Sequence, residues 1–462
     1  LAQIDGKKLD KFHIKNQSSA DEVIEKLKGA EYKVKEIRRK EIKRTPPPPF
    51  TTSTLQQEAS RKLRFSAKKT MAVAQKLYEG VTIEGNMTGL ITYMRTDSVN
   101  LAESALYSIK EKVIEMFGKT YSLKIPRKYK QKSKNAQEAH EAIRPTDIKL
   151  TPEEVKAYVP ADQFKLYDLI WKRTLACQMA PALLDSVSVD ILAQDIYLFR
   201  ATGSTIQFPG FMKVYIEGKD DESDETKGML PQLSTDQILT LIELMPEQHF
   251  TQPPPRYTEA TLVKTLEEYG IGRPSTYASI IDILRTRKYV SMANRRFLPE
   301  DLGLTVSKLL VNHFPRYVDY EFTAQMEEEL DEIARAEISW KPVVRNFWKP
   351  FIELIDRKDS EVKKSDVVNE ETDEICPQCG EHLIIKLGRY GRFYGCKGYP
   401  KCNYMRPLND KGEGSDNQEE AVEEHCEKCS KPMVVKEGRY GKFLACSGYP
   451  QCKTTRSFNK SA

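Results

Sequence analysis

The stretch CPQCGEHLIIKLGRYGRFYGCKGYPKC, residues 376–402, recurs 50 positions later as CEKCSKPMVVKEGRYGKFLACSGYPQC, residues 426–452. Both copies have the spacing C-x2-C-x16-C-x5-C, and the likeness extends to the residues between the cysteines. Two copies of one small structural unit are therefore predicted at this end of the chain. The cysteines of the two copies are Cys376, Cys379, Cys396 and Cys402, followed by Cys426, Cys429, Cys446 and Cys452.

Each set of four cysteines predicts a structural Zn²⁺ site. Four thiolates suit tetrahedral zinc, and a closed metal site replaces the core that about 30 residues cannot build. The alternative is a disulfide framework, which is typical of small secreted chains; zinc is favoured because no secretory signal is visible. The ninth cysteine, Cys177, lies in the apolar string LACQMAPALL and is predicted to be a buried thiol rather than a nucleophile.

The charge pattern around the repeats points to nucleic acid. Residues 376–406 carry six basic and one acidic side chain, and 426–456 carry seven and two, so each copy has a net charge of +5. The acidic linkers have net charges of −3 (357–375) and −6 (407–425). Cations follow phosphates and rings stack on bases in single-strand binding, although the same rings can instead form a small core. The rings proposed for stacking are Tyr390, Phe393, Tyr440 and Phe443.

The composition of the whole chain sets outer limits. Its 462 residues predict about three domains. It is 30% charged with a net charge of +5, which by itself names no partner. No run approaches the ~18 apolar residues of a membrane-spanning helix.

Periodicity in residues 1–357 predicts a mixed α and β body. Alternation predicts strands at 11–16 and 32–43 and an antiparallel meander from Ala182 to Ile216. A tetraproline, Pro46–Pro49, predicts a rigid connector. Helices are predicted from a cap at Ser53 or Thr54 to residue 80, over 102–118, and through most of 257–357.

The string GLITYMRTDSVNL, residues 89–101, holds a candidate nucleophile. A tyrosine at the end of a strand could attack a phosphodiester if a neighbour favours its phenolate. Arg95 lies two residues beyond Tyr93, on the same face of a strand, where it could neutralise phosphate oxygens. Taken alone, the string also fits a buried strand tyrosine beside a surface arginine.

A second string, AQEAHEAIRPTDI, places His140 and Arg144 four residues apart. On a helix the two side chains would share a face and could hold one phosphate. The alternative is an ordinary helix end before Pro145.

A third string, residues 256–290, predicts two helices on either side of a glycine-rich turn, a helix-turn-helix-like unit. Ser275 is predicted to cap the second helix, whose N-terminus could bind phosphate. Further donors for a nucleic acid are Arg256, Arg273, Thr276, Arg285 and Arg287.

These three strings, in this order and followed by four-cysteine units, resemble the bacterial DNA topoisomerase I family, the type IA topoisomerases. The resemblance covers essentially the whole chain. It implies an α+β multidomain fold: a toroidal body of arch and helical domains, then two zinc ribbons. It also implies ATP-independent relaxation of negatively supercoiled DNA through a 5′-phosphotyrosine on one strand. The match to YMRTDS implies that Tyr93 is the nucleophile and that Arg95 assists at the phosphate. The match to AHEAIRP implies that His140 positions the site and that Arg144 contacts DNA. Arg273, Thr276 and Arg287 match positions that hold the single strand, and Arg256 is expected to contact DNA beside them.

The resemblance further implies a domain order, in which the parts alternate along the chain. The expected parts are the arch (1–52 and 181–252), the nucleophile-bearing domain (53–180), a helical DNA-groove domain (253–357), linkers (358–375 and 407–425) and zinc ribbons (376–406 and 426–456). The implied partners are single-stranded or negatively supercoiled DNA, with RNA polymerase as a candidate protein partner. The implied setting is a monomer in the bacterial cytoplasm, associated with the nucleoid and not with a membrane.

One element of the family pattern is missing. The family begins with a Toprim domain whose acidic D-x-D-x-E cluster holds Mg²⁺, and here the nearest match is KDDESDE, residues 219–225, which reads as a solvated hairpin tip. With Leu1 as the first residue, the expectation is a fragment that lacks the Mg²⁺ site of the full-length enzyme and is inactive alone.

Two other classes of protein share part of this pattern. A non-catalytic module could bind single-stranded DNA through the zinc ribbons, with Tyr93 structural. A tyrosine recombinase also uses tyrosine and arginine, but it places its tyrosine after the arginine and histidine elements, which is the reverse of the order here.

Overall fold

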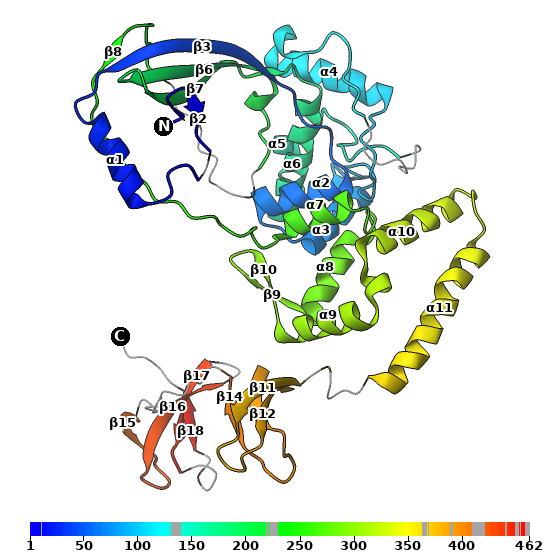
Figure 1. Ribbon diagram of the computed structural model, residues 1–462. Coiled ribbons are helices and arrows are strands. Elements are labelled where there is room, and N and C mark those ends of the chain that lie inside the picture. Colours follow the sequence, from blue (N-terminus) through cyan, green and yellow to red (C-terminus); the bar gives the residue numbers. More distant parts are fainter. Residues whose placement is uncertain are drawn as a thin grey trace. The chain divides into compact units, whose positions relative to one another are not determined.

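The computed structural model describes residues 1–10, 12–130, 140–218, 220, 230–362, 367, 369–388, 391–408, 421–438, 441–448, 452 and 454–457. The chain divides into two compact units, Leu1–Asp356 and Arg357–Ala462, which Figure 1 draws in sequence colours. Each unit is described by itself. No helix among the described residues combines the length and the apolar character that a membrane crossing needs.

The first unit contains a long antiparallel sheet in the order β2-β1-β7-β6-β3-β8. Its length comes from the pairing of β3 (Tyr32–Arg44), β6 (Ala182–Ala193) and β7 (Tyr197–Phe208), and α1 (Gln17–Leu27) packs against one end of it (Figure 1). The strands predicted from alternation at 32–43 and over most of 182–208 are confirmed as β3, β6 and β7. The short strands are β1 (Gln3–Ile4), β2 (Lys7–Lys8) and β8 (Ile238–Leu239).

Two predicted strands are wrong. Residues 12–16 form turns and bends before α1, where the side chain of Asn16 caps the helix by accepting from Ser19 N. Residues 211–218, the expected third strand of the meander, instead follow Pro209 into the 3₁₀ turn η3 (Gly210–Lys213). Alternation over a few residues was too short to distinguish a strand from a turn.

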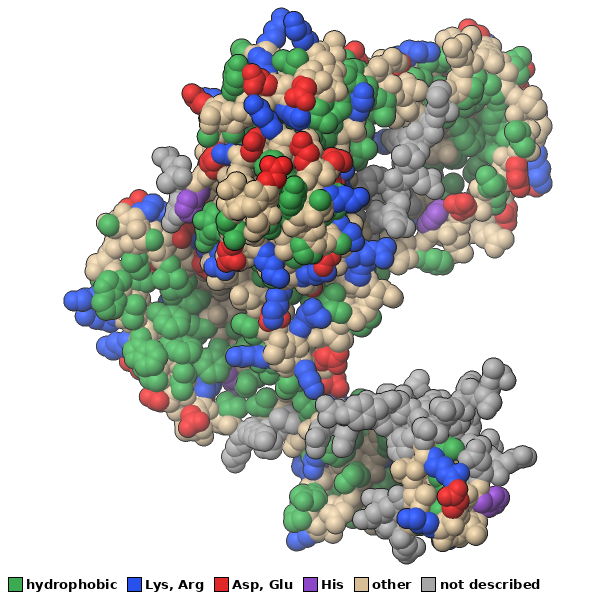
Figure 2. Space-filling view, turned by 180° about the vertical axis from the view of Figure 1, so that it is seen from behind, with side chains coloured by type: hydrophobic (Ala, Val, Ile, Leu, Met, Phe, Trp, Pro, Cys, Tyr) green, Lys and Arg blue, Asp and Glu red, His purple; other side chains and the backbone are tan. Residues whose placement is uncertain are grey.

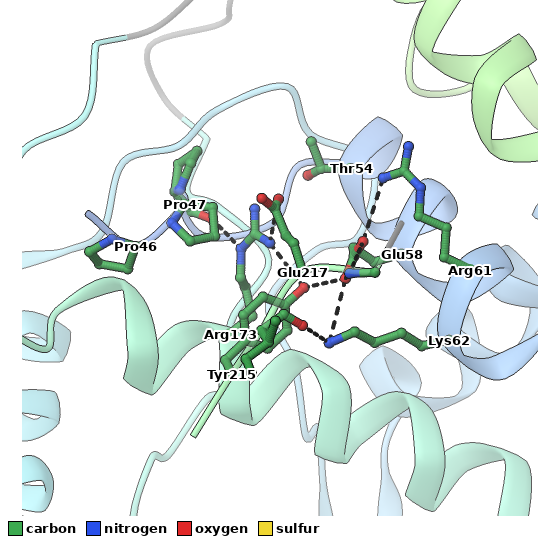
Figure 3. Close-up of polar contacts among 12 residues, drawn as sticks. Pro46, Pro47, Thr54, Glu58, Arg61, Lys62, Arg173, Tyr215 and Glu217 are labelled. Carbon is green, nitrogen blue, oxygen red and sulfur yellow. Dashed lines mark hydrogen bonds and ion pairs between the residues drawn. The ribbon is translucent and has the colours of Figure 1, made fainter. Parts of the chain in front are cut away.

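The segments that follow β3 and β7, at one end of the long sheet, are fastened to the same helix by a buried arginine, Arg173 of α6 (Ala161–Cys177) (Figure 3). Its Nε donates to the carbonyl of Pro48, beyond the end of β3, at 2.6 Å. Its Nη1 donates to the Tyr215 hydroxyl at 2.9 Å and to Glu217 at 3.0 Å, on the segment that follows β7. The tetraproline is therefore a connector, as predicted. The hydrogen bond that holds it comes from Arg173, 125 positions further along the chain.

A buried carboxylate completes this cluster. Glu58 accepts from the Tyr215 hydroxyl and from Gly218 N, and it lies 3.5 Å from Arg61 and 3.7 Å from Lys62 (Figure 3). Burial of both charges is tolerated because each is hydrogen-bonded. We call Arg173, Glu58, Tyr215 and Glu217 the Arg173 cluster.

The helix predicted from residue 53 to residue 80 is wrong, since the segment forms two helices. Thr51, not Ser53 or Thr54, caps α2 (Thr52–Glu58), and a π-helical turn η1 (Ala59–Leu63) follows. Arg64 then adopts a left-handed conformation with φ 57°, and Ser66 caps α3 (Ala67–Glu79). A left-handed residue ends a helix, so the amphipathic pattern continues across a break that periodicity does not reveal.

The main core of the first unit joins α2, α3, α4 and α6. Helix α4 (Glu103–Phe117) agrees with its prediction. The remaining elements here are β4 (Val81–Ile83), β5 (Asn86–Thr88), η2 (Lys119–Tyr121) and α5 (Pro152–Val155).

The helical part of the first unit begins at α7 (Glu259–Glu268) and is interrupted by a hairpin of β9 (Val290–Ala293) and β10 (Arg296–Pro299). Helices α9, α10 and α11 contain no fully buried side chain among their residues, all of which are described. Hydrophobic side chains gather at the surface over these helices (Figure 2), among them Trp340 and Trp348. The other elements are α8 (Tyr277–Thr286), α9 (Asp301–His313), η4 (Pro315–Val318), α10 (Tyr320–Ala334) and α11 (Trp340–Glu361).

The second unit consists of two antiparallel four-stranded sheets of the same design, as the repeat predicts. The first contains β11 (Glu370–Ile375), β12 (His382–Gly388), β13 (Gly391–Cys396) and β14 (Met405–Pro407). The second contains β15 (Ala421–His425), β16 (Pro432–Gly438), β17 (Gly441–Cys446) and β18 (Thr455–Ser457).

Candidate active site and cysteine clusters

Tyr93 lies on an irregular segment to which side-chain hydroxyls bond, and the predicted strand is wrong. The segment forms only an isolated bridge, Ile91 to Pro145. The Thr52 hydroxyl contacts the carbonyl of Met94 at 2.7 Å, and the Thr92 hydroxyl donates to the carbonyl of Ala142 at 2.7 Å. Together with backbone bonds from Thr92 N to the carbonyl of Arg144 (2.9 Å) and from Thr146 N to that of Leu90 (3.0 Å), they fix the backbone on both sides of Tyr93.

The alternation of side chains nevertheless survives in this segment. Tyr93 and Arg95 are exposed, whereas Met94, Thr96 and Ser98 are buried. The tyrosine as a whole is 41% exposed. Tyr93 and Arg95 therefore face solvent together, which is the relationship that the strand prediction required.

Two aromatic rings flank the Tyr93 ring. Tyr78, in the last turn of α3, lies with its ring centroid 5.3 Å from that of Tyr93 at an interplanar angle of 67°. The His140 ring lies 6.3 Å away at 65°. The structure thus brings His140 to Tyr93 across 47 residues of sequence, and it adds Tyr78, which the sequence analysis did not single out.

The predicted helix that carries His140 and Arg144 is wrong. Residues 140–142 have no regular secondary structure and lead to the bridge between Phe50 and Ile143. Arg144 donates to Glu141 at 2.7 Å and to the carbonyls of Pro145 (2.9 Å) and Thr146 (3.2 Å). Its guanidinium is therefore engaged within its own loop in this structure.

A third part of the site brings Arg273 near the Tyr93 segment. Burial raises the pKa of Asp97, four residues after Tyr93; the charge of Asp331 adds to this, while His140 and Arg273 oppose it. Arg273 donates to Asp331 at 2.9 Å and to the carbonyl of Gly272 at 2.8 Å. Asp97 and Asp331 were missed as site residues, because no spacing in the sequence connects α10 with the Tyr93 segment.

The other residues proposed to contact DNA near Arg273 differ in their exposure and in their bonding partners. Ser275 was predicted to cap α8, and this is wrong. Thr276 is the residue that precedes α8, and its hydroxyl accepts from Arg273 N at 2.8 Å. Arg256 and Arg287 are exposed. Arg285 pairs with Glu259 at 3.7 Å.

Two carboxylates of α7, the helix that precedes Arg273, bond to α2 and α3, the helices that contact the Tyr93 segment. Glu259 accepts from Ala67 N, at the start of α3, at 2.6 Å, and Glu267 accepts from the Ser53 hydroxyl at 2.8 Å. Burial raises the pKa of Glu259. The sequence offered no signal for either contact.

The cysteine clusters have the geometry of tetrahedral metal sites. In each cluster all four sulfur atoms lie within 4.8 Å of one another. The paired Sγ distances are 3.7 and 3.3 Å in the first cluster and 3.6 and 3.2 Å in the second, near the edge of about 3.8 Å expected for four thiolates around zinc. A disulfide would need about 2.0 Å, so the alternative framework does not fit.

The remaining predicted residues are less completely described. Phe393 lies half-buried on β13, and Phe443 lies on β17 in a stretch whose side chains are not described. Tyr390 and Tyr440 lie outside the described residues, as does KDDESDE except Asp220, which accepts from Arg61. Cys177 is fully buried, and burial raises the pKa of its thiol to about 12, as expected of a structural thiol.

Comparisons with known proteins agree with this arrangement. Residues 2–345 match the family described as DNA topoisomerase, and residues 373–411 and 423–461 match the topoisomerase DNA binding C4 zinc finger. The chain is 49% identical over 436 residues to DNA topoisomerase 1 of Rickettsia felis, covering 91% of this chain and 55% of that protein. It is 49% identical over 398 residues to DNA topoisomerase 1 of Xylella fastidiosa strain Temecula1, covering 85% and 49%.

A solved structure shares the fold. The full-length topoisomerase I of Thermotoga maritima superimposes with a TM-score of 0.70 at 34% identity, covering 91% of this chain and 64% of that one. The chain spans about half the length of the curated relatives that it matches.

Proposed function

The chain belongs to the bacterial type IA DNA topoisomerase family, and on that premise we propose that it carries the nucleophile and much of the DNA grip of a strand-passing enzyme. The observation that carries the proposal is the exposed Tyr93 beside exposed Arg95 and the His140 ring, on a segment that side-chain hydroxyls hold in place. The proposed substrate is a single-stranded region of negatively supercoiled DNA.

The proposed chemistry is a reversible transesterification. The Tyr93 oxygen loses its proton and attacks a backbone phosphorus, forming a 5′-phosphotyrosine, while the 3′-oxygen of the broken strand leaves and takes up a proton. Arg95 supports the charge on the phosphate oxygens. After the other strand has passed, the 3′-hydroxyl attacks the phosphotyrosine and releases Tyr93. One phosphoester replaces another at each step, so no ATP is required.

The roles of the other residues follow from their surroundings. His140 is proposed to position the site from beside the Tyr93 ring, and Arg256, Arg273, Thr276 and Arg287 to hold the strand. For Arg144 the proposal is indirect: its bonds to Glu141 shape the loop that carries His140.

The proposal includes structural Zn²⁺ at the two cysteine clusters. The two cysteine clusters fit structural Zn²⁺, which would hold each four-stranded sheet together. Within the described part of the chain these are also the only clusters of three or more side chains suited to hold a metal ion.

The proposal is tested by trapping the covalent intermediate. A single-stranded oligonucleotide labelled at its 3′ end is incubated with Mg²⁺, the protein and a separately supplied Toprim domain, and denaturation is followed by electrophoresis. Label should remain on the wild-type protein and be lost with Tyr93→Phe. Transfer of a 5′ label instead would indicate a 3′-linkage and favour recombinase chemistry.

A second candidate, single-strand binding by the ribbons without chemistry, is supported by their net charge of +5 each and by the match to a DNA-binding zinc finger. Affinity for single-stranded DNA should fall when the chain is ended at Asp356, the boundary of the first unit. Unchanged affinity would rule out the ribbon role. A monomeric state and RNA polymerase as a partner remain predictions.

A further inference from the structure

Tyr78 and Tyr93 form an edge-to-face aromatic pair at the candidate active site. Their ring centroids are 5.3 Å apart with an interplanar angle of 67°, and both rings are 41% exposed. Edge-to-face pairs at this distance are attractive beyond the area that they bury, because the positive edge of one ring meets the negative face of the other. The orientation of the Tyr93 ring thus depends in part on Tyr78.

The backbone of Tyr78 is locked against the segment that leads to Tyr93. Leu90 N donates to the carbonyl of Leu77 at 2.8 Å, and both of these leucine side chains are fully buried. Gly89 passes so close that a Cβ there would lie 2.8 Å from the carbonyl oxygen of Tyr78. A residue larger than glycine at position 89 would push α3 away from this segment, so the close approach is built into the sequence.

The Tyr93 side chain itself has few other constraints. The backbone on both sides is held through Thr92 and Met94, but the ring projects into solvent between Tyr78 and His140. Attack on phosphorus requires the phenolic oxygen to be aligned with the bond that breaks, and small errors in such alignment are costly. A half-exposed ring therefore needs neighbours that limit its rotamers.

From this geometry we propose that Tyr78 is a positioning residue for Tyr93: its ring holds the nucleophile's ring in the orientation needed for attack. That Tyr78 orients the Tyr93 ring rests on the contact between the two rings alone. That this orientation favours attack on phosphorus rests on the proposed function. Helix α3 supplies a rigid support, since Gly80 N closes its last turn on the carbonyl of Lys76 at 3.2 Å. The alternative role for Tyr78, stacking on a DNA base, makes a different prediction about affinity.

The structural part is tested by ¹⁹F NMR on protein labelled with 3-fluorotyrosine, with the Tyr93 signal assigned from Tyr93→Phe. Tyr78→Leu should shift and narrow the Tyr93 signal, because the ring gains motion, whereas Tyr78→Phe should leave it nearly unchanged. Tyr107→Leu is the matched control, since Tyr107 is a 65% exposed tyrosine on α4. The proposal is overturned if Tyr78→Leu leaves the shift and width of the Tyr93 signal unchanged, or if Tyr107→Leu changes them equally.

The catalytic part is tested by the rate of covalent transfer of a 3′-labelled oligonucleotide at saturating DNA. Tyr78→Leu should lower the rate about 3- to 10-fold, the loss expected for one aromatic pair, with unchanged DNA affinity and near-normal rate in Tyr78→Phe. Weakened affinity with an unchanged rate would mean that Tyr78 stacks on a base and would overturn the proposal. If wild-type protein transfers no label, the proposed function fails, and the NMR result still decides whether Tyr78 holds Tyr93.

Discussion

Thr52 and Thr96 hold each other through a reciprocal pair of hydrogen bonds. The N–H of Thr52 donates to the carbonyl of Thr96 at 2.8 Å, and the N–H of Thr96 donates to the Thr52 hydroxyl at 2.8 Å. The Thr52 hydroxyl also reaches the carbonyl of Met94 at 2.7 Å. The first residue of α2 thereby fixes the backbone on the C-terminal side of Tyr93.

Replacing Thr52 by valine should weaken both folding and attack. Valine keeps the shape but leaves the buried N–H of Thr96 without a partner, at a cost of about 1–3 kcal/mol in the free energy of unfolding. Urea denaturation measures this loss, and the rate of covalent transfer should fall with it. Thr202→Val, at an exposed position on β7, should change stability by less than about 0.5 kcal/mol. Equal effects of the two substitutions would refute the role of Thr52.

Removing the guanidinium of Arg173 should destabilise the first unit strongly. Arg173→Met leaves the carbonyl of Pro48 without its donor, at a cost of about 1–3 kcal/mol, whereas Glu217 is 54% exposed and can be solvated. Hydrogen exchange should rise in the segments that follow β3 and β7. Lys172→Met, which removes an exposed ion pair with Asp168 on the same helix, should have little effect. A variant as stable as wild type would show that the Arg173 cluster does not hold the sheet.

The pH dependence of stability should reveal the buried carboxylate of Glu259. Its pKa is raised from the ordinary 4.5, chiefly by burial, against the opposing effects of Ala67 N and Arg285. The folded state therefore binds this proton more tightly than the unfolded state does, and wild type loses stability relative to Glu259→Gln as the pH rises above 4.5. The measurement is the difference in unfolding free energy between the two proteins from pH 4 to about 8. Glu268→Gln, at an exposed site on α7, should show no such trend, and a flat difference for Glu259→Gln would contradict the prediction.

The cysteine clusters should bind two zinc ions per chain, one for each set of four thiols. Elemental analysis of the purified protein should find this ratio, and Cys379→Ser should lower it to about one, since one ligand of a four-thiolate site is lost. Cys177→Ser is the control, because the Cys177 thiol is buried far from either cluster in sequence and bonds to the carbonyl of Thr174. Retention of both ions by Cys379→Ser would show that the first cluster is not the zinc site.

Much of the architecture could be read from local patterns. The cysteine repeat predicted both units of the C-terminal region, and long alternation predicted β3, β6 and β7. The failures occurred where a pattern was short or where side chains replaced regular structure. The Tyr93 and His140 segments were predicted as strand and helix, yet both are irregular, and hydroxyl groups of Thr52 and Thr92 help to hold them.

The identity of the chemical groups was therefore present in the sequence alone: a tyrosine with an arginine two residues on, a histidine, a basic turn and eight paired cysteines. Their types and spacings depend only on neighbours in the chain. What only the tertiary structure decided was which groups meet. Asp97 comes under the influence of Arg273 and Asp331 because α7 docks on α2 and α3, and Tyr78 meets Tyr93 because Gly89 lets the chain pass close to α3. Such contacts depend on packing between residues far apart in sequence, and periodicity carries no information about them.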